Sequence, residues 1–239
     1  MKLFQLVAVL AAIGAIAMVG FSASGEPEQS SGETGSAAAA KATPLPKDVY
    51  ADSLSRLPLV KRENLDEQGK KAYDDAAGDT RSLVGLQGPG GIRLHSPRLA
   101  ETARPSNQYL RFDTKLGRRL SELAILVTAR ELDQQFEWTA HEGAGLKAGL
   151  EPAIIDVVRN RKAVTGLGEK ETTIIQLGRE LFQKRKVSSD LFARALKLFG
   201  EETLVDIVSL MGNYASTSVL LNAFDQHLLP GQKPLLPMP

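Results

Sequence analysis

Apolar side chains recur every three or four positions along most of the chain beyond residue 47. The segment LGRRLSELAILVTARELD shows the pattern with Leu120, Leu123, Ala124, Val127 and Leu132. This spacing places the apolar side chains on one face of a helix, and that face requires burial. The same kind of pattern returns at residues 64–77, 95–112, 135–150, 152–163, 169–185, 188–200 and 201–224.

No segment alternates apolar and polar residues over the length of a strand. Helical faces of this kind are buried only against other helices, so the pattern predicts an all-α domain of about seven or eight helices. Asn64 is the expected N-cap of the first helix. Ser96 and Pro97 are typical of a second helix start, and Pro105 is expected to interrupt or kink that helix.

The N-terminal residues are typical of an export signal. A positively charged start, Met1-Lys2, precedes the apolar run Leu6–Val19, and small residues follow it. The run is short for a membrane span and has the length of a signal-peptide core. We therefore expect a signal peptide at residues 1–24 and an exported protein, periplasmic or secreted. An uncleaved membrane anchor is the alternative; after cleavage no stable membrane association is expected.

The regions on either side of the helical part differ from it in composition. Residues 25–46 are rich in Ser, Gly, Ala, Glu and Pro without apolar periodicity, which is typical of a flexible linker. The helical domain is expected at residues 47–230, and residues 231–239 form a Pro-rich tail.

Composition narrows the possible chemistry. A chain of 239 residues with 43% hydrophobic side chains can form one well-packed domain with tails. Its net charge of +1 gives no excess of basic residues for binding nucleic acid. Cysteine is absent, so disulfides, thiolate nucleophiles and sulfur metal sites are excluded. Any chemistry must use oxygen and nitrogen groups.

Two candidate motifs carry little weight. The glycine-rich segment GLQGPGGIRL lacks the Lys-Ser/Thr ending and the strand of a phosphate-binding loop, so it is predicted to be a turn. The three histidines, His95, His141 and His227, lie far apart and form no H-x-x-x-H pair for zinc.

One group of polar residues is a candidate site. Gln134, Glu137 and His141 are spaced i, i+3 and i+7, which predicts one face of one helix, and Glu122 lies on the preceding helix. A carboxylate beside an imidazole can exchange a proton near neutral pH, as general acid–base catalysis requires. The structural alternative is an ordinary surface pair of Glu137 with His141.

The same residues carry a resemblance to a known family. The segments LHSPRLAE, YLRFDTKLGRRLSELAILVTARELDQQFEWTAHEGAGLKAGL and LVDIVSLMGNYASTSVLLNAF resemble the carboxymuconolactone decarboxylase family, within the alkylhydroperoxidase D-like superfamily. The likeness runs from about Leu65 to Leu229. Its most specific part is R-L-x-E-L-x-I-L followed by E-W-x-x-H. The resemblance implies an all-α fold of paired helices that assembles as a trimer or hexamer.

Two differences between this sequence and the family pattern indicate which of the family's branches the chain resembles. The peroxidase branch has a C-x-x-C pair before the histidine, and Gln134 and Glu137 occupy those positions here. Peroxide reduction by a dithiol requires a thiolate, so that activity is not expected. Glu122 and His141 match the superfamily's proton-relay residues, and the E-W pair resembles the decarboxylase branch.

The resemblance implies a cofactor-free lyase or isomerase that acts on a small carboxylated or lactone-like compound. His141 is the expected general acid–base, Glu122 its orienting carboxylate and Glu137 a second carboxylate. Because the decarboxylase's lactone is made in the cytoplasm, an exported protein is expected to use another compound. Gln134, Trp138 and Arg130 are the candidate substrate contacts, although packing alone explains an aromatic such as Trp138.

Two other functions stay open, and one expectation concerns assembly. The pocket could serve a non-catalytic, ligand-binding oligomer, or Glu122, Glu137 and His141 could hold a metal.

The apolar segment ETLVDIVSLMGNYASTSVLLNAF offers more apolar surface than a small domain covers. A homo-oligomer, a trimer or a multiple of it, is therefore expected, with a small-molecule substrate as the other partner.

Overall fold

The computed structural model describes residues 44–238, and in this range the protein is all-α, as predicted. The described range contains eight α-helices: α1 (Glu67–Ala77), α2 (Pro89–Arg93), α3 (Pro97–Gln108), α4 (Arg118–Glu131), α5 (Gln135–Lys147), α6 (Pro152–Arg159), α7 (Glu169–Arg179) and α8 (Ser189–Ala223). Three short helical turns accompany them: η1 (Arg62–Asn64), η2 (Tyr109–Asp113) and η3 (Glu180–Lys184). The predicted signal peptide and nearly all of the predicted linker lie outside the described residues.

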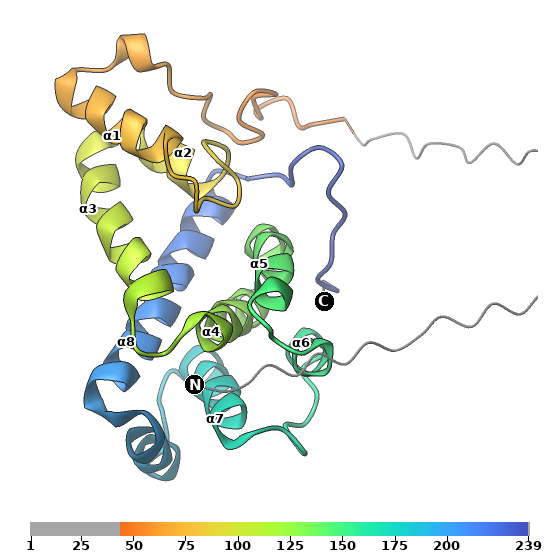
Figure 1. Ribbon diagram of the computed structural model, residues 1–239. Coiled ribbons are helices and arrows are strands. Elements are labelled where there is room, and N and C mark those ends of the chain that lie inside the picture. Colours follow the sequence, from red (N-terminus) through yellow and green to blue (C-terminus); the bar gives the residue numbers. More distant parts are fainter. Residues whose placement is uncertain (1–43, 239) are drawn as a thin grey trace, which may run out of the picture. The chain divides into compact units, whose positions relative to one another are not determined.

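Helix α4 is the central element of the described unit. It packs against α5, α6, α7 and α8, and Figure 1 shows it between these helices. All ten residues from Ser121 to Arg130 are buried. The predicted face is buried at Leu123, Ala124 and Val127. Burial also extends to the other sides of the helix, because neighbouring helices enclose it. Leu120 and Leu132, at its two ends, are only half-buried.

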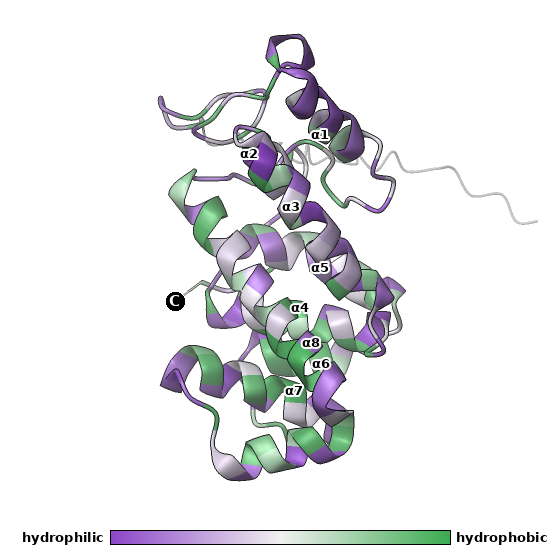
Figure 2. Cartoon of the chain, turned by 90° about the vertical axis from the view of Figure 1, so that its left-hand side faces the viewer, coloured by the Kyte–Doolittle hydropathy of each residue, from purple (hydrophilic) through white to green (hydrophobic). Residues whose placement is uncertain are grey.

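The apolar core surrounds α4. Leu123 and Leu126 of α4, Ile174 of α7 and Ile207 of α8 are at most 1% exposed. Figure 2 shows hydrophobic residues concentrated on α4, α6, α7 and α8, whereas α1 and α3 are mostly hydrophilic. The segment from α1 to α3 therefore lies outside the main core, and it supplies much of the wall of a cavity described below.

Helix boundaries follow local chemistry. Helix α1 begins two residues later than the predicted helix, because Asp66 is its N-cap and accepts a hydrogen bond from the Gly69 amide at 2.7 Å. Asn64 instead ends η1. Helix α3 begins at Pro97, as predicted, but continues through Pro105 to Gln108. The π-helical turn η2 follows it directly.

At two glycines the backbone differs from what the sequence predicted. The glycine-rich segment is more than a turn, because Gly88, with φ of 90°, leads into the short helix α2. The predicted helices 188–200 and 201–224 are joined as α8 across a kink at Gly200, where φ is 74°.

By length and composition α8 is the one described helix that could cross a membrane, but half of its most apolar stretch is buried in the protein. Core helices of globular proteins commonly share these properties.

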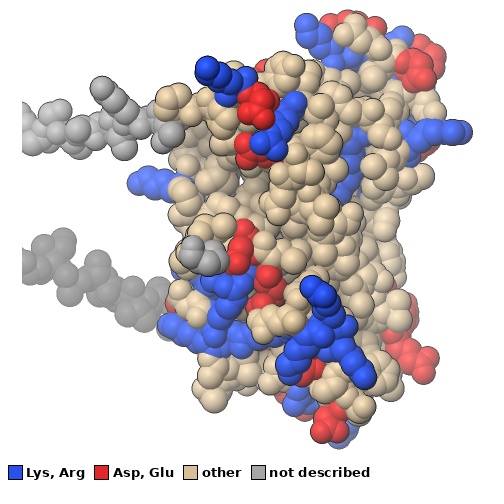
Figure 3. Space-filling view, turned by 180° about the vertical axis from the view of Figure 1, so that it is seen from behind, with Lys and Arg blue, Asp and Glu red and all other residues tan. Residues whose placement is uncertain are grey.

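Charged side chains of both signs are interspersed on the surface. On the face shown in Figure 3, Lys and Arg lie beside Asp and Glu, with uncharged surface between the charged groups. Exposed ion pairs of the protein include Lys162 with Asp156 and Lys71 with Asp75. Exposed pairs of this kind contribute little to stability, so apolar packing around α4 holds the helices together.

Close contact between α4 and α7 yields a stability prediction. A Cβ at Gly178 of α7 would lie 2.2 Å from Cγ1 of Val127, a buried β-branched residue with little rotamer freedom. We expect Gly178→Ala to lower the free energy of unfolding by about 1–3 kcal/mol in urea denaturation, as overpacking does.

The matched control is Gly143→Ala on α5, an exposed position where an added Cβ has no neighbour within 4 Å. Alanine is the better helix former, so this variant is expected to gain up to about 1 kcal/mol. Equal effects of the two substitutions would contradict the described contact between α4 and α7.

Candidate functional site

The site begins at the tight turn between α4 and α5. Gln134 is the N-cap of α5, and its side-chain oxygen accepts a hydrogen bond from the Phe136 amide at 2.8 Å. Its amide nitrogen donates to Asn222 Oδ1 at 2.6 Å. Because Gln134 precedes the helix, the predicted three-residue face reduces to Glu137 and His141. Gln134 caps the helix and does not line the cavity.

Glu122 and His141 form a buried pair between α4 and α5. Their atoms Oε2 and Nδ1 are 2.7 Å apart, and the two residues are 0% and 4% exposed. The other oxygen of Glu122 accepts a hydrogen bond from Arg118 Nη2 at 2.5 Å. Both carboxylate oxygens are therefore paired, which a buried charge requires.

The second nitrogen of His141 faces two further polar groups. Nε2 lies 3.2 Å from the Tyr214 hydroxyl and 3.4 Å from Oε2 of Glu137. The Tyr214 ring meets the imidazole edge to face, with centroids 5.0 Å apart. With Nδ1 bonded to Glu122, Nε2 is the nitrogen that can exchange a proton on this side.

The two carboxyl groups have opposite pKa shifts. Burial acts to raise the pKa of Glu122, but the charge and hydrogen bond of His141, together with the charges of Arg118 and Arg111, lower it below its ordinary value. Burial raises the pKa of Glu137 above its ordinary value of 4.5, and the opposing charge of His141 does not cancel that effect. Burial likewise raises the pKa of Tyr214, so its phenol stays neutral. Pairs of carboxyls with separated pKa values are typical of acid–base sites.

Glu137 and His141 open onto a cavity of about 130 Å³. The walls come from α1, the 79–85 segment, α2, α3, η2, α5 and α8. Residues that contribute side chains around the reactive groups are Asp79, Arg93, Arg104, Asn107, Gln108, Arg111, Glu137, His141, Tyr214 and Thr217. Glu122 does not line the cavity and contacts it only through His141. The cavity is therefore placed to receive a small molecule against the imidazole.

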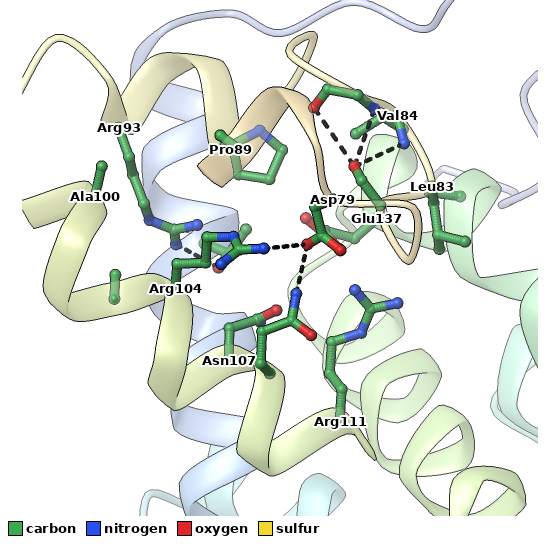
Figure 4. A pocket seen from close by; sticks show the side chains of 18 of the residues that line it. Asp79, Leu83, Val84, Pro89, Arg93, Ala100, Arg104, Asn107, Arg111 and Glu137 are labelled. Atoms are coloured by element: carbon green, nitrogen blue, oxygen red, sulfur yellow. Dashed lines mark hydrogen bonds and ion pairs between the residues drawn. The ribbon is translucent and has the colours of Figure 1, made fainter. Parts of the chain in front are cut away.

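Three arginines surround the cavity, as Figure 4 shows. Arg93 donates a hydrogen bond to the Thr217 hydroxyl at 2.8 Å, and Arg104 lies 3.5 Å from a carboxylate oxygen of Asp79. Arg111 comes from η2. Sequence reasoning missed these residues and Tyr214, because they lie on four separate elements and share no spacing. The cavity wall favours an anionic ligand.

Two of the predicted substrate contacts lie away from the cavity. Trp138 is 0% exposed in the apolar core, and its indole nitrogen donates to Glu142 at 2.6 Å. Arg130 donates to the carbonyl of Pro237 at 2.7 Å and pairs with Asp133 at 2.9 Å. Neither side chain lines the cavity. Their positions on α4 and α5 point them toward other neighbours than the imidazole.

The metal alternative meets a geometric difficulty. Glu122 approaches Nδ1 of His141 while Glu137 lies beside Nε2. The two carboxylates thus contact opposite nitrogens of one ring and do not converge on a common point. Among residues 44–238, no group of three or more His, Cys, Asp or Glu side chains is arranged to hold a metal ion.

Comparison with protein-family models and with curated proteins found no match to this chain. The resemblance to the carboxymuconolactone decarboxylase family therefore stays a prediction from the sequence. The functional proposal below depends on the side chains of the cavity.

The raised pKa of Glu137 predicts a pH-dependent stability. The unfolded chain releases this proton near pH 4.5 and the folded chain releases it at higher pH, so stability falls as pH rises through the folded value. Glu137→Gln removes the buried ionisation. Its free energy of unfolding, relative to the parent protein, should therefore increase from pH 4.5 to 8 in urea denaturation.

Glu122→Gln serves as the opposite case. The folded pKa of Glu122 is lowered, so its contribution to stability is present above pH 4.5 and is lost as pH falls through the folded value. This variant should be less stable than the parent protein at neutral pH, by an amount that shrinks in acid. The same pH trend in both variants would show that the two environments are assigned wrongly.

Proposed function

We propose that the cavity is the active site of a cofactor-free lyase or isomerase that transfers a proton to or from carbon in a small carboxylated or lactone-like compound. One observation carries the proposal: the buried 2.7 Å contact between Glu122 and His141, whose imidazole reaches the cavity beside Glu137. An imidazole held by a buried carboxylate, with its second nitrogen toward a ligand cavity, is a common arrangement for acid–base catalysis.

His141 is the group that moves the proton in this proposal. Its Nε2 takes a proton from the substrate carbon or returns one to it, and Glu122 stabilises the imidazolium formed when the ring gains a proton. In a decarboxylation the C–CO₂⁻ bond breaks, CO₂ leaves, and the electron pair stays on the substrate. His141 then supplies the proton that forms the new C–H bond.

Glu137 has a different role because its pKa is raised. In its protonated form it can donate a hydrogen bond to a carbonyl or lactone oxygen of the substrate. That oxygen gains negative charge when electrons move into the carbonyl group, and a preorganised donor stabilises this charge. The cationic side chains Arg93 and Arg111 add to the stabilisation from the cavity wall.

We also propose membership of the carboxymuconolactone decarboxylase family. The support is the sequence resemblance, the all-α architecture, and the contact between Glu122 and His141, the two residues that match the family's proton relay. The chain has no cysteine, so the dithiol peroxidase chemistry of the wider superfamily is not part of the proposal.

The proposal predicts the effect of removing the imidazole. The parent protein is screened in D₂O with small carboxylated lactones and unsaturated acids, measuring CO₂ release and deuterium incorporation at carbon. For the compound that reacts, His141→Ala and Glu122→Gln should each lower turnover at least about a hundredfold, the usual contribution of a general acid–base group. The double variant should lose little more, because the residues act as a unit.

The control is His95→Ala, which removes an exposed histidine bonded to the Pro58 carbonyl, outside this cavity. It should keep the parental rate. If His141→Ala melts at a lower temperature but retains its rate per folded molecule, the pair is structural and the proposed mechanism is wrong. Binding without any turnover would instead favour the ligand-binding alternative.

Self-association is part of the proposed function as well. Helix α8 exposes Val205 by 63%, Val208 by 39% and Val219 by 68%, with the exposed Gly212 between them. These positions fall on one side of the helix. An apolar strip of this kind supports a symmetric homo-oligomer, a trimer or a multiple of it.

Light scattering at micromolar concentration should give a mass several times that of the 25.7 kDa chain. The double variant Val205→Glu, Val219→Glu should shift the mass toward the monomer, since it places charges on the apolar strip. Leu99→Glu, at a residue of α3 that is 48% exposed, is the control and should leave the mass unchanged. A monomeric parent protein would refute the assembly.

A further inference from the structure

Unpaired polar atoms gather on one wall of the cavity. Buried side-chain atoms without a partner among residues 44–238 include Nε of Arg104, Oε1 of Gln108, and both Nε and Nη2 of Arg111. All three residues line the cavity. Buried polar atoms normally have hydrogen-bond partners, because an unpaired buried atom has lost its bonds to water without replacement. Their concentration here indicates a ligand that supplies the missing partners.

Arg111 is the most distinctive of these residues. It is only 7% exposed, and among the described residues its guanidinium has no hydrogen-bond or ion-pair partner. The π-helical turn η2 carries it, and Arg118 donates to the Arg111 carbonyl at 2.7 Å, which holds the backbone of this turn. Figure 4 shows the guanidinium pointing from η2 into the cavity.

The two unpaired atoms of Arg111 define the chemistry of the ligand. Nε and Nη2 lie on the same edge of the planar guanidinium, and their N–H bonds are parallel. This edge matches the two oxygens of a carboxylate, which it binds through two hydrogen bonds. We propose that Arg111 binds the substrate's carboxylate through this edge and thereby selects carboxylates over neutral lactones and amides; the inference rests on the proposed function for its reaction.

The charges around Arg111 support an anion at this place. Asp79 is already engaged by Arg104 at 3.5 Å and by the Gln108 amide at 2.5 Å. Arg93 has only the neutral Thr217 as a hydrogen-bond partner. Arg93 and Arg111 thus face the cavity without a carboxylate at ion-pair distance in the described part of the chain. An incoming carboxylate would offset this excess of positive charge.

The volume of the cavity and the position of Arg111 in it limit the ligands that can bind. A cavity of about 150 Å³ accommodates benzene, and the cavity here measures about 130 Å³. A five-membered ring that carries one carboxylate is of suitable size. Arg111 and Glu137 line the same cavity. A carboxylate bound to Arg111 would therefore place the attached ring beside the proton-transfer groups.

The test uses 2-furoate and 2-furamide, which share a ring and differ in charge. Isothermal titration calorimetry of the full chain should show binding of 2-furoate and at least about tenfold weaker binding of 2-furamide. Arg111→Gln should weaken 2-furoate at least about tenfold and leave the weak 2-furamide binding unchanged. Arg111→Lys, which keeps the charge but loses the planar edge, should also weaken 2-furoate several-fold.

Arg81→Gln is the matched control. Arg81 lies 4.6 Å from the Phe112 ring, as Arg111 does at 4.7 Å, but it does not line the cavity. This variant should bind 2-furoate within about twofold of the parent protein, since only the long-range charge has changed. Melting curves establish whether each variant is folded. If Arg111→Gln does not fold, the binding of 2-furoate by Arg111→Lys tests the inference.

Three results would overturn the inference: undiminished 2-furoate binding by Arg111→Gln and Arg111→Lys, equal binding of 2-furamide, or no 2-furoate binding by the parent protein. Because calorimetry needs no turnover, the two proposals fail separately. Binding that depends on Arg111, together with an unaffected rate in His141→Ala, would retain the carboxylate site and refute proton transfer. The reverse combination would refute the carboxylate site alone.

Discussion

The hydrogen bond between Glu122 and His141 is the interaction on which the described site depends. Glu122 is fully buried within α4, the helix that the rest of the core surrounds. A carboxylate in that place is stable only with partners on both oxygens, and His141 and Arg118 supply them. The requirement fixes α5 against α4 and holds the imidazole at the cavity in one orientation. The same hydrogen bond therefore joins α5 to α4 and orients the imidazole at the cavity.

The imidazole of His141 lies between two carboxyl groups with different environments. Glu122 and Glu137 both lie near His141, yet paired charges lower the pKa of one and burial raises the pKa of the other. A buried phenol, Tyr214, closes the same corner. Arg93 and Arg111 also line the cavity, and neither has a carboxylate at ion-pair distance among the described residues. Titratable groups thus lie at one corner of the cavity and cationic groups on its wall, which is the arrangement that the proposed reaction of a small acid at carbon requires.

The sequence predicted the helices because apolar spacing is a local property. It also predicted the pairing of Glu122 with His141, since consecutive helices joined by a short turn must pack together. It did not predict that α4 is buried all round, because periodicity describes one helix and not its neighbours. Arg93, Arg111 and Tyr214 could not be found, since they meet only when α2, η2 and α8 assemble. Arg130 was a candidate substrate contact because a guanidinium can bind a carboxylate, and Trp138 because it lies between Glu137 and His141 in the sequence. Their side chains pack elsewhere in the structure.

The tautomer of His141 tests the central claim most directly. Nitrogen-15 NMR of the histidines at alkaline pH, where the imidazole is neutral, distinguishes the protonated ring nitrogen from the free one. The contact with Glu122 predicts that Nδ1 of His141 carries the proton, that Nε2 has a free lone pair, and that Glu122→Gln disturbs this state. A proton on Nε2 of His141 in the parent protein, or a mixture of its two tautomers, would contradict the account.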